Sequence, residues 1–166
     1  MSPARGLALC ALALAAACGG AEIRGGHGTS EAALRRTTKV LSFVPEDCRD
    51  AHEAPTLTRS ARVEIVRLAS GEAALVEYRP GYDALVILNS FIDGNVQVFQ
   101  AIIEPGDGDP LLHEFRIPEP ATAAGEVRVS DRFSEEPLSS GGFRARGQGL
   151  VSRCALSPVM APEPQH

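Results

Sequence analysis

The chain has 166 residues, of which 44% are hydrophobic and 5% aromatic, and its formal net charge is −5. This length suits one domain with a core of its own. The acidic balance excludes the basic surface that is typical of nucleic-acid-binding proteins, so we expect no nucleic-acid partner. The sequence shows no internal repeat and no sign of a second domain.

The N-terminus carries the pattern of a secretory signal. Arg5 precedes an apolar run at residues 6–17. This run is shorter than the roughly 20 apolar residues that a membrane-spanning helix needs. We therefore expect residues 1–17 to be a signal peptide.

The end of the apolar run, Ala15-Ala16-Ala17-Cys18-Gly19, resembles the lipobox of bacterial lipoproteins. In that family the cysteine is acylated and becomes the first residue after cleavage, so the resemblance implies a lipid on Cys18. Ala15 departs from the family's pattern, in which Leu is usual. The alternative is an ordinary signal that is cut near Ala17 without lipid. Gly19 lacks the usual inner-membrane retention signal, so the outer membrane is favoured.

Two cysteines remain once Cys10 leaves with the leader and Cys18 takes the lipid. These are Cys48 and Cys154. We expect them to form a disulfide in the oxidising compartment that such a protein occupies. The alternative is two separately buried thiols.

The segment after the leader is rich in glycine. Residues 18–29 predict a flexible tether that spans roughly 20 Å. Residues 30–44 follow with Ser30 as a helix cap and apolar residues at helical spacing, although the β-branched residues from Thr37 onward also suit a strand. We predict one short helix that runs into a strand and stops at Pro45. Residues 45–60 are then a polar loop.

From Arg62 onward the apolar pattern has a period of two, which is typical of strands. Turn residues separate strands expected at residues 62–69, 73–79, 84–92, 95–103, 111–117, 126–133 and 143–156. The pattern predicts a mainly β fold, an antiparallel β-sandwich or a small β-barrel of about seven strands. Residues 30–157 would form the single domain, and residues 158–166 a frayed tail.

The strongest hairpin signal is Asp93-Gly94. A two-residue loop there places Leu88 opposite Phe99 and gives the hairpin two apolar faces. We therefore expect this hairpin to be central and covered on both sides. The alternative is an uncovered face that binds a partner.

The sequence contains no motif for catalysis, a cofactor or a metal. The His-Glu pairs at residues 52–53 and 113–114 lack the spacing of a zinc-binding helix. Asp107 and Asp109 lie in a turn-like segment without the spacing of a calcium loop. His113 falls on an apolar strand face, which is typical of a core histidine. We therefore expect no enzyme activity, no cofactor and no metal.

Four arginines alternate with apolar residues on two late strands: Arg128, Arg132, Arg144 and Arg146. If these strands pair, the four guanidinium groups share one outer face. Guanidinium groups bind phosphate and carboxylate in a bidentate manner, so this face suits anionic envelope glycans or lipid headgroups. The alternative is a solvated face that neighbouring glutamates balance.

The sequence thus predicts a lipid-anchored protein of the bacterial cell envelope with a non-catalytic binding or scaffolding role. Its partners would be the membrane, through the lipid, and an envelope protein or anionic glycan. One alternative is a small barrel that acts as an inhibitor or ligand carrier in the periplasm, similar in broad plan to lipid-anchored lysozyme inhibitors, of which Cys154 alone is matched. Another is an enzyme without a recognisable site.

Overall fold

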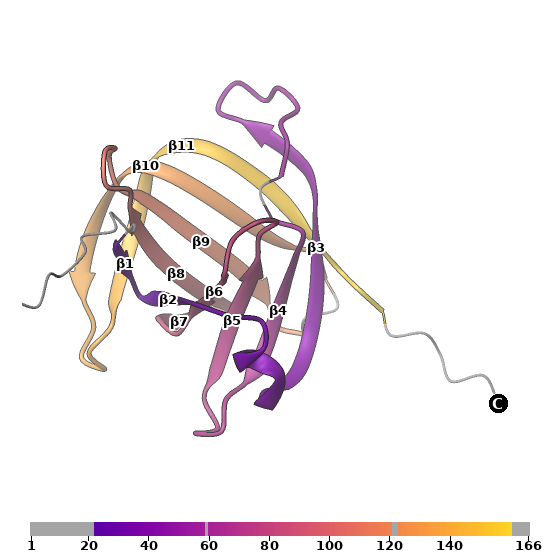
Figure 1. Ribbon diagram of the computed structural model, residues 1–166. Coiled ribbons are helices and arrows are strands. Elements are labelled where there is room, and N and C mark those ends of the chain that lie inside the picture. The colour runs from indigo at the N-terminus through magenta and orange to yellow at the C-terminus, as the bar shows by residue number, and fades with distance from the viewer. Residues whose placement is uncertain (1–21, 59, 121–122, 161–166) are drawn as a thin grey trace, which may run out of the picture.

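The computed structural model describes residues 22–58, 60–120 and 123–160, so the expected signal peptide, the lipid on Cys18 and the end of the tail lie outside it. The described chain is mainly β and forms one 11-stranded sheet that curls into a nearly closed antiparallel barrel (Figure 1). The elements are β1 (Glu22–Arg24), β2 (Gly26–Thr29), the 3-10 helix η1 (Ala33–Arg36), β3 (Thr38–Asp50), β4 (Arg62–Arg67), β5 (Ala73–Tyr78), β6 (Ala84–Ile87), β7 (Ser90–Asp93), β8 (Val96–Glu104), β9 (Leu111–Pro118), β10 (Gly125–Pro137) and β11 (Phe143–Pro158). The described residues include no helix that is long and apolar enough to cross a bilayer.

The barrel closes through the segment that the sequence predicted as a tether, and that prediction is wrong for residues 22–29. β1 pairs with β8 and β2 pairs with β6, so the two short strands bridge the gap between those edges. Gly25 lies between them with φ +82°, and a Cβ there would come within 2.6 Å of the Gln100 carbonyl oxygen. Glycine is therefore required where three strands approach one another.

The expected helix and loop at residues 30–60 are both shorter than predicted. Helical structure is limited to η1, while β3 continues through Pro45 to Asp50. β3 tolerates this proline because its pairing with β4 ends at Phe43, which leaves one edge of β3 without a hydrogen-bond ladder at Pro45. Leu34 of η1 is buried against the outer faces of β4, β5 and β6.

The number of strands exceeds the expected seven for local reasons. The segment predicted as one strand at residues 84–92 is divided into β6 and β7, and the additional strands β1, β2 and β3 lie before residue 62. The strand order is β1-β8-β9-β10-β11-β3-β4-β5-β6-β2, with β7 beside β8. The side chains that fill the interior are Phe43, Val63, Ile65, Leu75, Leu85, Ile87, Phe99, Ala101, Phe115, Ile117, Val127 and Leu156.

The β7–β8 hairpin turns one residue later than predicted. Asp93 pairs with Val96, so the two-residue loop is Gly94-Asn95. Gly94 has φ +63° whereas Asn95 does not have a positive φ, the arrangement of a type II′ rather than a type I′ turn. The new register moves Leu88 out of the ladder.

As a result of this register, the side chains of Phe99 and Leu88 are buried to very different extents. Phe99 is fully buried, but Leu88 is 44% exposed, so the predicted contact between two buried side chains is wrong. Ser90 lies opposite Phe99 instead. β8 itself is covered on both faces, since Phe99 faces the interior and Ile102 packs under the β10–β11 hairpin.

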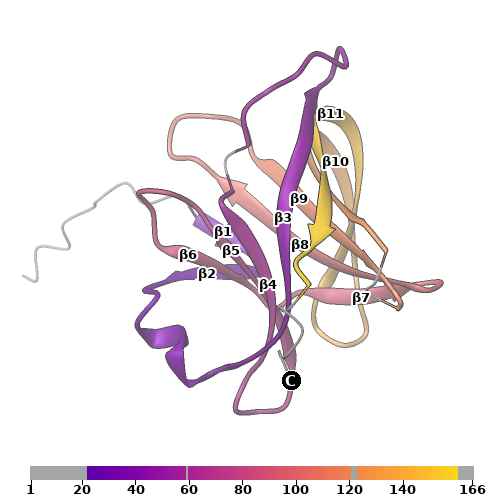
Figure 2. The same ribbon diagram turned by 90° about the vertical axis from the view of Figure 1, so that its right-hand side faces the viewer.

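The long β10–β11 hairpin folds over the outer faces of β8 and β9 (Figure 2). Two side-chain amides hold it there. Gln100 accepts a hydrogen bond from the Ala145 N–H and donates one to its carbonyl, both at 2.8 Å. Asn89 makes the same pair of contacts with Phe143, at 2.9 and 3.0 Å. These contacts explain why Gln100 is fully buried on the outside of the barrel.

Cys48 and Cys154 form a disulfide, which confirms the expected pairing. Their Cα atoms are 4.1 Å apart, on the adjacent strands β3 and β11. The bond therefore joins an early strand to the last one, across 106 residues of sequence.

Candidate functional site

A groove of about 410 Å³ lies on the outer face of the barrel, between β9, β10 and the folded-over part of β11. Four arginines line it: Arg116, Arg128, Arg144 and Arg146. Three of them are arginines that the sequence predicted for an anion-binding face. The fourth predicted residue, Arg132, is not among the lining residues; its side chain is 77% exposed and its Nε lies 3.8 Å from Asp131.

Strand pairing and packing position these arginines. On the outer face of β9 and β10, Arg128 lies opposite Glu114 and Arg116 lies opposite Glu126. On β11, Ala145 packs toward β8 and β9. Arg144 and Arg146 flank Ala145 and therefore project from the other face of the strand.

Carboxylates hold two of the arginines in place. The Arg116 guanidinium donates to Asp93 at 2.9 Å, and Nε of Arg128 lies 3.1 Å from Glu126. The hydrogen bond from Arg116, followed by its charge, lowers the pKa of Asp93, and the charges of Arg144 and Arg146 lower it further. Asp93 itself lines the groove, so its carboxylate already lies in the field of three of the four arginines.

Arg144 and Arg146 are held more loosely. The Arg144 guanidinium carbon lies 4.6 Å from the centre of the Phe91 ring, and its Nη1 is 3.8 Å from Glu136. Arg146 is exposed and forms no ion pair within the described part of the chain. These two guanidinium groups are the ones best placed to receive an external anion.

A second concavity, of about 210 Å³, lies at the open end of the barrel, which we call the mouth pocket. Its apolar lining is Leu57, Leu111, Val127, Val129 and Val151. Its polar lining includes three buried side chains, Ser60, Glu77 and His113. His113 is thus a buried residue of the barrel interior, as its strand pattern indicated.

The polar cluster of the mouth pocket is not arranged like a serine hydrolase. The Ser60 hydroxyl donates to Oε1 of Glu77, and Nδ1 of His113 lies 3.9 Å from the other carboxylate oxygen. A serine nucleophile requires the imidazole, rather than the carboxylate, as the acceptor of its proton. We therefore interpret Ser60, Glu77 and His113 as polar lining of the pocket rather than as a catalytic triad.

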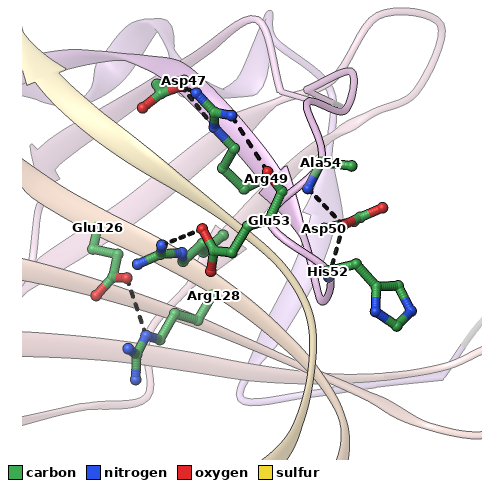
Figure 3. A network of polar contacts seen from close by, with 9 residues as sticks. Asp47, Arg49, Asp50, His52, Glu53, Ala54, Glu126 and Arg128 are labelled. Carbon is green, nitrogen blue, oxygen red and sulfur yellow. Dashed lines mark hydrogen bonds and ion pairs between the residues drawn. The ribbon is translucent and has the colours of Figure 1, made fainter.

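A network of polar contacts fixes the start of the loop that covers the pocket (Figure 3). Asp50 accepts hydrogen bonds from the backbone N–H groups of His52, at 2.8 Å, and Ala54, at 3.0 Å. These two bonds, that from His52 first, lower the pKa of Asp50. Arg153 of β11 donates to Glu53 at 2.6 Å and so ties the loop to the neighbouring strand.

Sequence reasoning missed Arg116 because its strand alternates like any half-buried strand. A usable signal was present, since β9 precedes β10 and an antiparallel pair places outward residues of both strands on one face. Among the described residues, no three His, Cys, Asp or Glu side chains gather in a way that could hold a metal ion. No protein-family model matches the chain, and comparisons with curated proteins and with solved structures find no match either.

Proposed function

We propose that this chain is an exported lipoprotein of the bacterial envelope that binds an anionic group in its arginine groove without catalysing a reaction. The observation that carries the proposal is the meeting of four guanidinium groups, from three strands, around one groove of about 410 Å³. Asp93 and Glu114 also line the groove, so its four guanidinium groups exceed its carboxylates by two, in a chain whose formal net charge is −5. Such a site attracts and orients an anion.

The chemistry of the groove favours phosphate or carboxylate groups. Guanidinium binds both in a bidentate manner, and several such groups can share one multivalent anion. The carboxylates already present do not prevent this, because exposed ion pairs such as Arg144–Glu136 contribute little stability and exchange readily. An anionic glycan of the envelope is the ligand class that we favour.

We expect the double variant Arg144→Gln/Arg146→Gln to bind inorganic pyrophosphate at least about 10-fold more weakly than the wild type, because charge-assisted hydrogen bonds contribute about 1.5–3 kcal/mol each. Isothermal titration calorimetry at low and moderate salt measures this difference. The matched control is Arg35→Gln/Arg36→Gln, which removes the same charge from two exposed arginines of η1. Equal weakening in the control would show that net charge, and not the groove, attracts the anion.

The lipid is tested separately. We expect cells fed a fatty-acid probe to label the wild-type protein and to leave Cys18→Ser unlabelled, because the thiol is the acylated group in the lipobox pattern. In-gel detection of the probe provides the measurement. Label that persists in Cys18→Ser, or that is absent from the wild type, would contradict the anchor.

A small-ligand carrier is the second candidate function, and the mouth pocket favours it. The pocket combines apolar walls with a few convergent polar groups, which is the usual composition of a ligand site. Its volume of about 210 Å³ limits it to a small ligand or to part of a larger one.

A further inference from the structure

The N-terminal strand enters the barrel at its mouth. β1 starts with Glu22 opposite Glu104 and Ile23 opposite Ile103. Ile103 in turn lies opposite Leu111, which lines the mouth pocket. The start of the described chain is therefore on the rim of the mouth.

The chain between this rim and the proposed lipid is short. Three residues separate Cys18 from Glu22 in the sequence. Whatever their conformation, the four Cα–Cα steps reach at most about 14 Å. A lipid on Cys18 would therefore hold the rim of the mouth close to the surface of the bilayer.

The loop between β3 and β4 presents an apolar side chain on the same rim. Leu57 is 92% exposed, the highest exposure among the large hydrophobic side chains in the described ranges, and it lines the mouth pocket together with Leu111 and Val151. The loop, purple in Figures 1 and 2, extends beyond the ends of the neighbouring strands. Such a side chain gains stability when lipid replaces the water around it.

We propose that the mouth of the barrel lies against the bilayer that holds the lipid on Cys18, with Leu57 inserted into the membrane interface. The inference rests on the proposed function through this lipid. The mouth pocket then opens toward the membrane. Arg24 pairs with Glu104 of the rim at 3.4 Å. The rim beside β1 keeps an excess of acidic side chains, so the contact favours zwitterionic over anionic lipid. These side chains are Glu22, Glu104, Asp107 and Asp109.

The chain contains no tryptophan, so one substitution supplies a fluorescent reporter. The mature, lipidated variant Leu57→Trp is reconstituted into phosphatidylcholine vesicles with brominated acyl chains, which quench tryptophan that lies within the bilayer. We expect its emission to fall severalfold relative to vesicles of unbrominated lipid. Addition of phosphatidylglycerol should weaken the quenching, and stronger quenching would overturn the lipid preference.

Ile92→Trp is the matched control. Ile92 is also exposed, at 59%, and lies opposite Gln97 of β8. Gln97 is seven residues from Glu104 along β8, which is about 23 Å, so Ile92 lies toward the far end of the barrel. Its tryptophan should keep its emission in brominated vesicles.

The outcomes separate the orientation from the anchor. Protein that floats with the vesicles but shows no quenching in Leu57→Trp, or equal quenching in both variants, overturns the orientation and leaves the anchor standing. Protein that does not float overturns the lipid on Cys18 and the orientation with it. Pyrophosphate binding by the groove is measured in solution and does not depend on either result.

Discussion

Phe99→Ala should lower the free energy of unfolding by about 3–5 kcal/mol, the range for a phenylalanine removed from a packed core. Phe99 is fully buried in the barrel interior, and neighbours from several strands hold the emptied space open. Leu88→Ala should lower it by less than about 1 kcal/mol, because Leu88 is 44% exposed. Equilibrium denaturant unfolding of both variants measures the two values.

This pair of variants also tests the turn of the β7–β8 hairpin. A turn at Asp93-Gly94 would bury Leu88 opposite Phe99, and both truncations would then be costly. With the turn at Gly94-Asn95, only Phe99→Ala is costly. Equal losses would contradict the observed register, and a Phe99→Ala variant of normal stability that had lost a binding partner would mark an interface.

The β7–β8 hairpin shows which structural features a local sequence pattern can predict and which it cannot. Alternation and turn residues predicted correctly that β8 pairs with the segment just before it, because both signals are local. They could not choose between two adjacent loops, since Asp-Gly and Gly-Asn are both favourable in two-residue turns. The two loops differ by a shift of two residues in the pairing, with Ser90 in place of Leu88 opposite Phe99, so every side chain keeps its face and the apolar pattern does not distinguish them.

The predictions of a tether at residues 22–29 and of Arg132 on the arginine face were both wrong because each depends on how strands pair. Residues 22–29 are glycine-rich, which is typical of a linker, and their role appears only once the edges of β6 and β8 exist to be joined. Register shifts between Val129 and Phe133 interrupt the alternation of β10. Arg132 lies within these shifts, whereas Arg128 precedes them and lines the groove. The prediction for Arg132 assumed that side chains alternate without interruption along the whole of β10, and the register shifts break that alternation.

Reduction of the disulfide should lower the free energy of unfolding by about 4–5 kcal/mol. The bond closes a loop with a sequence separation of 106 residues. In the chain-entropy model, a loop of this length restricts the unfolded chain by roughly that amount. The pairing of β3 with β11 joins an early strand to the last one, so the disulfide covalently links two strands that are far apart in the sequence.

The measurement compares guanidinium unfolding of the wild type with and without reductant. Reduced wild type keeps both sulfur atoms in place, so the comparison isolates the covalent bond from the loss of buried side-chain atoms. Cys48→Ala/Cys154→Ala is the control, and its unfolding midpoint should not respond to reductant. Cys48 is 7% exposed and Cys154 packs against the main core, so this variant should be less stable than the reduced wild type. An unchanged midpoint for the wild type on complete reduction would show that strand pairing alone holds β3 against β11.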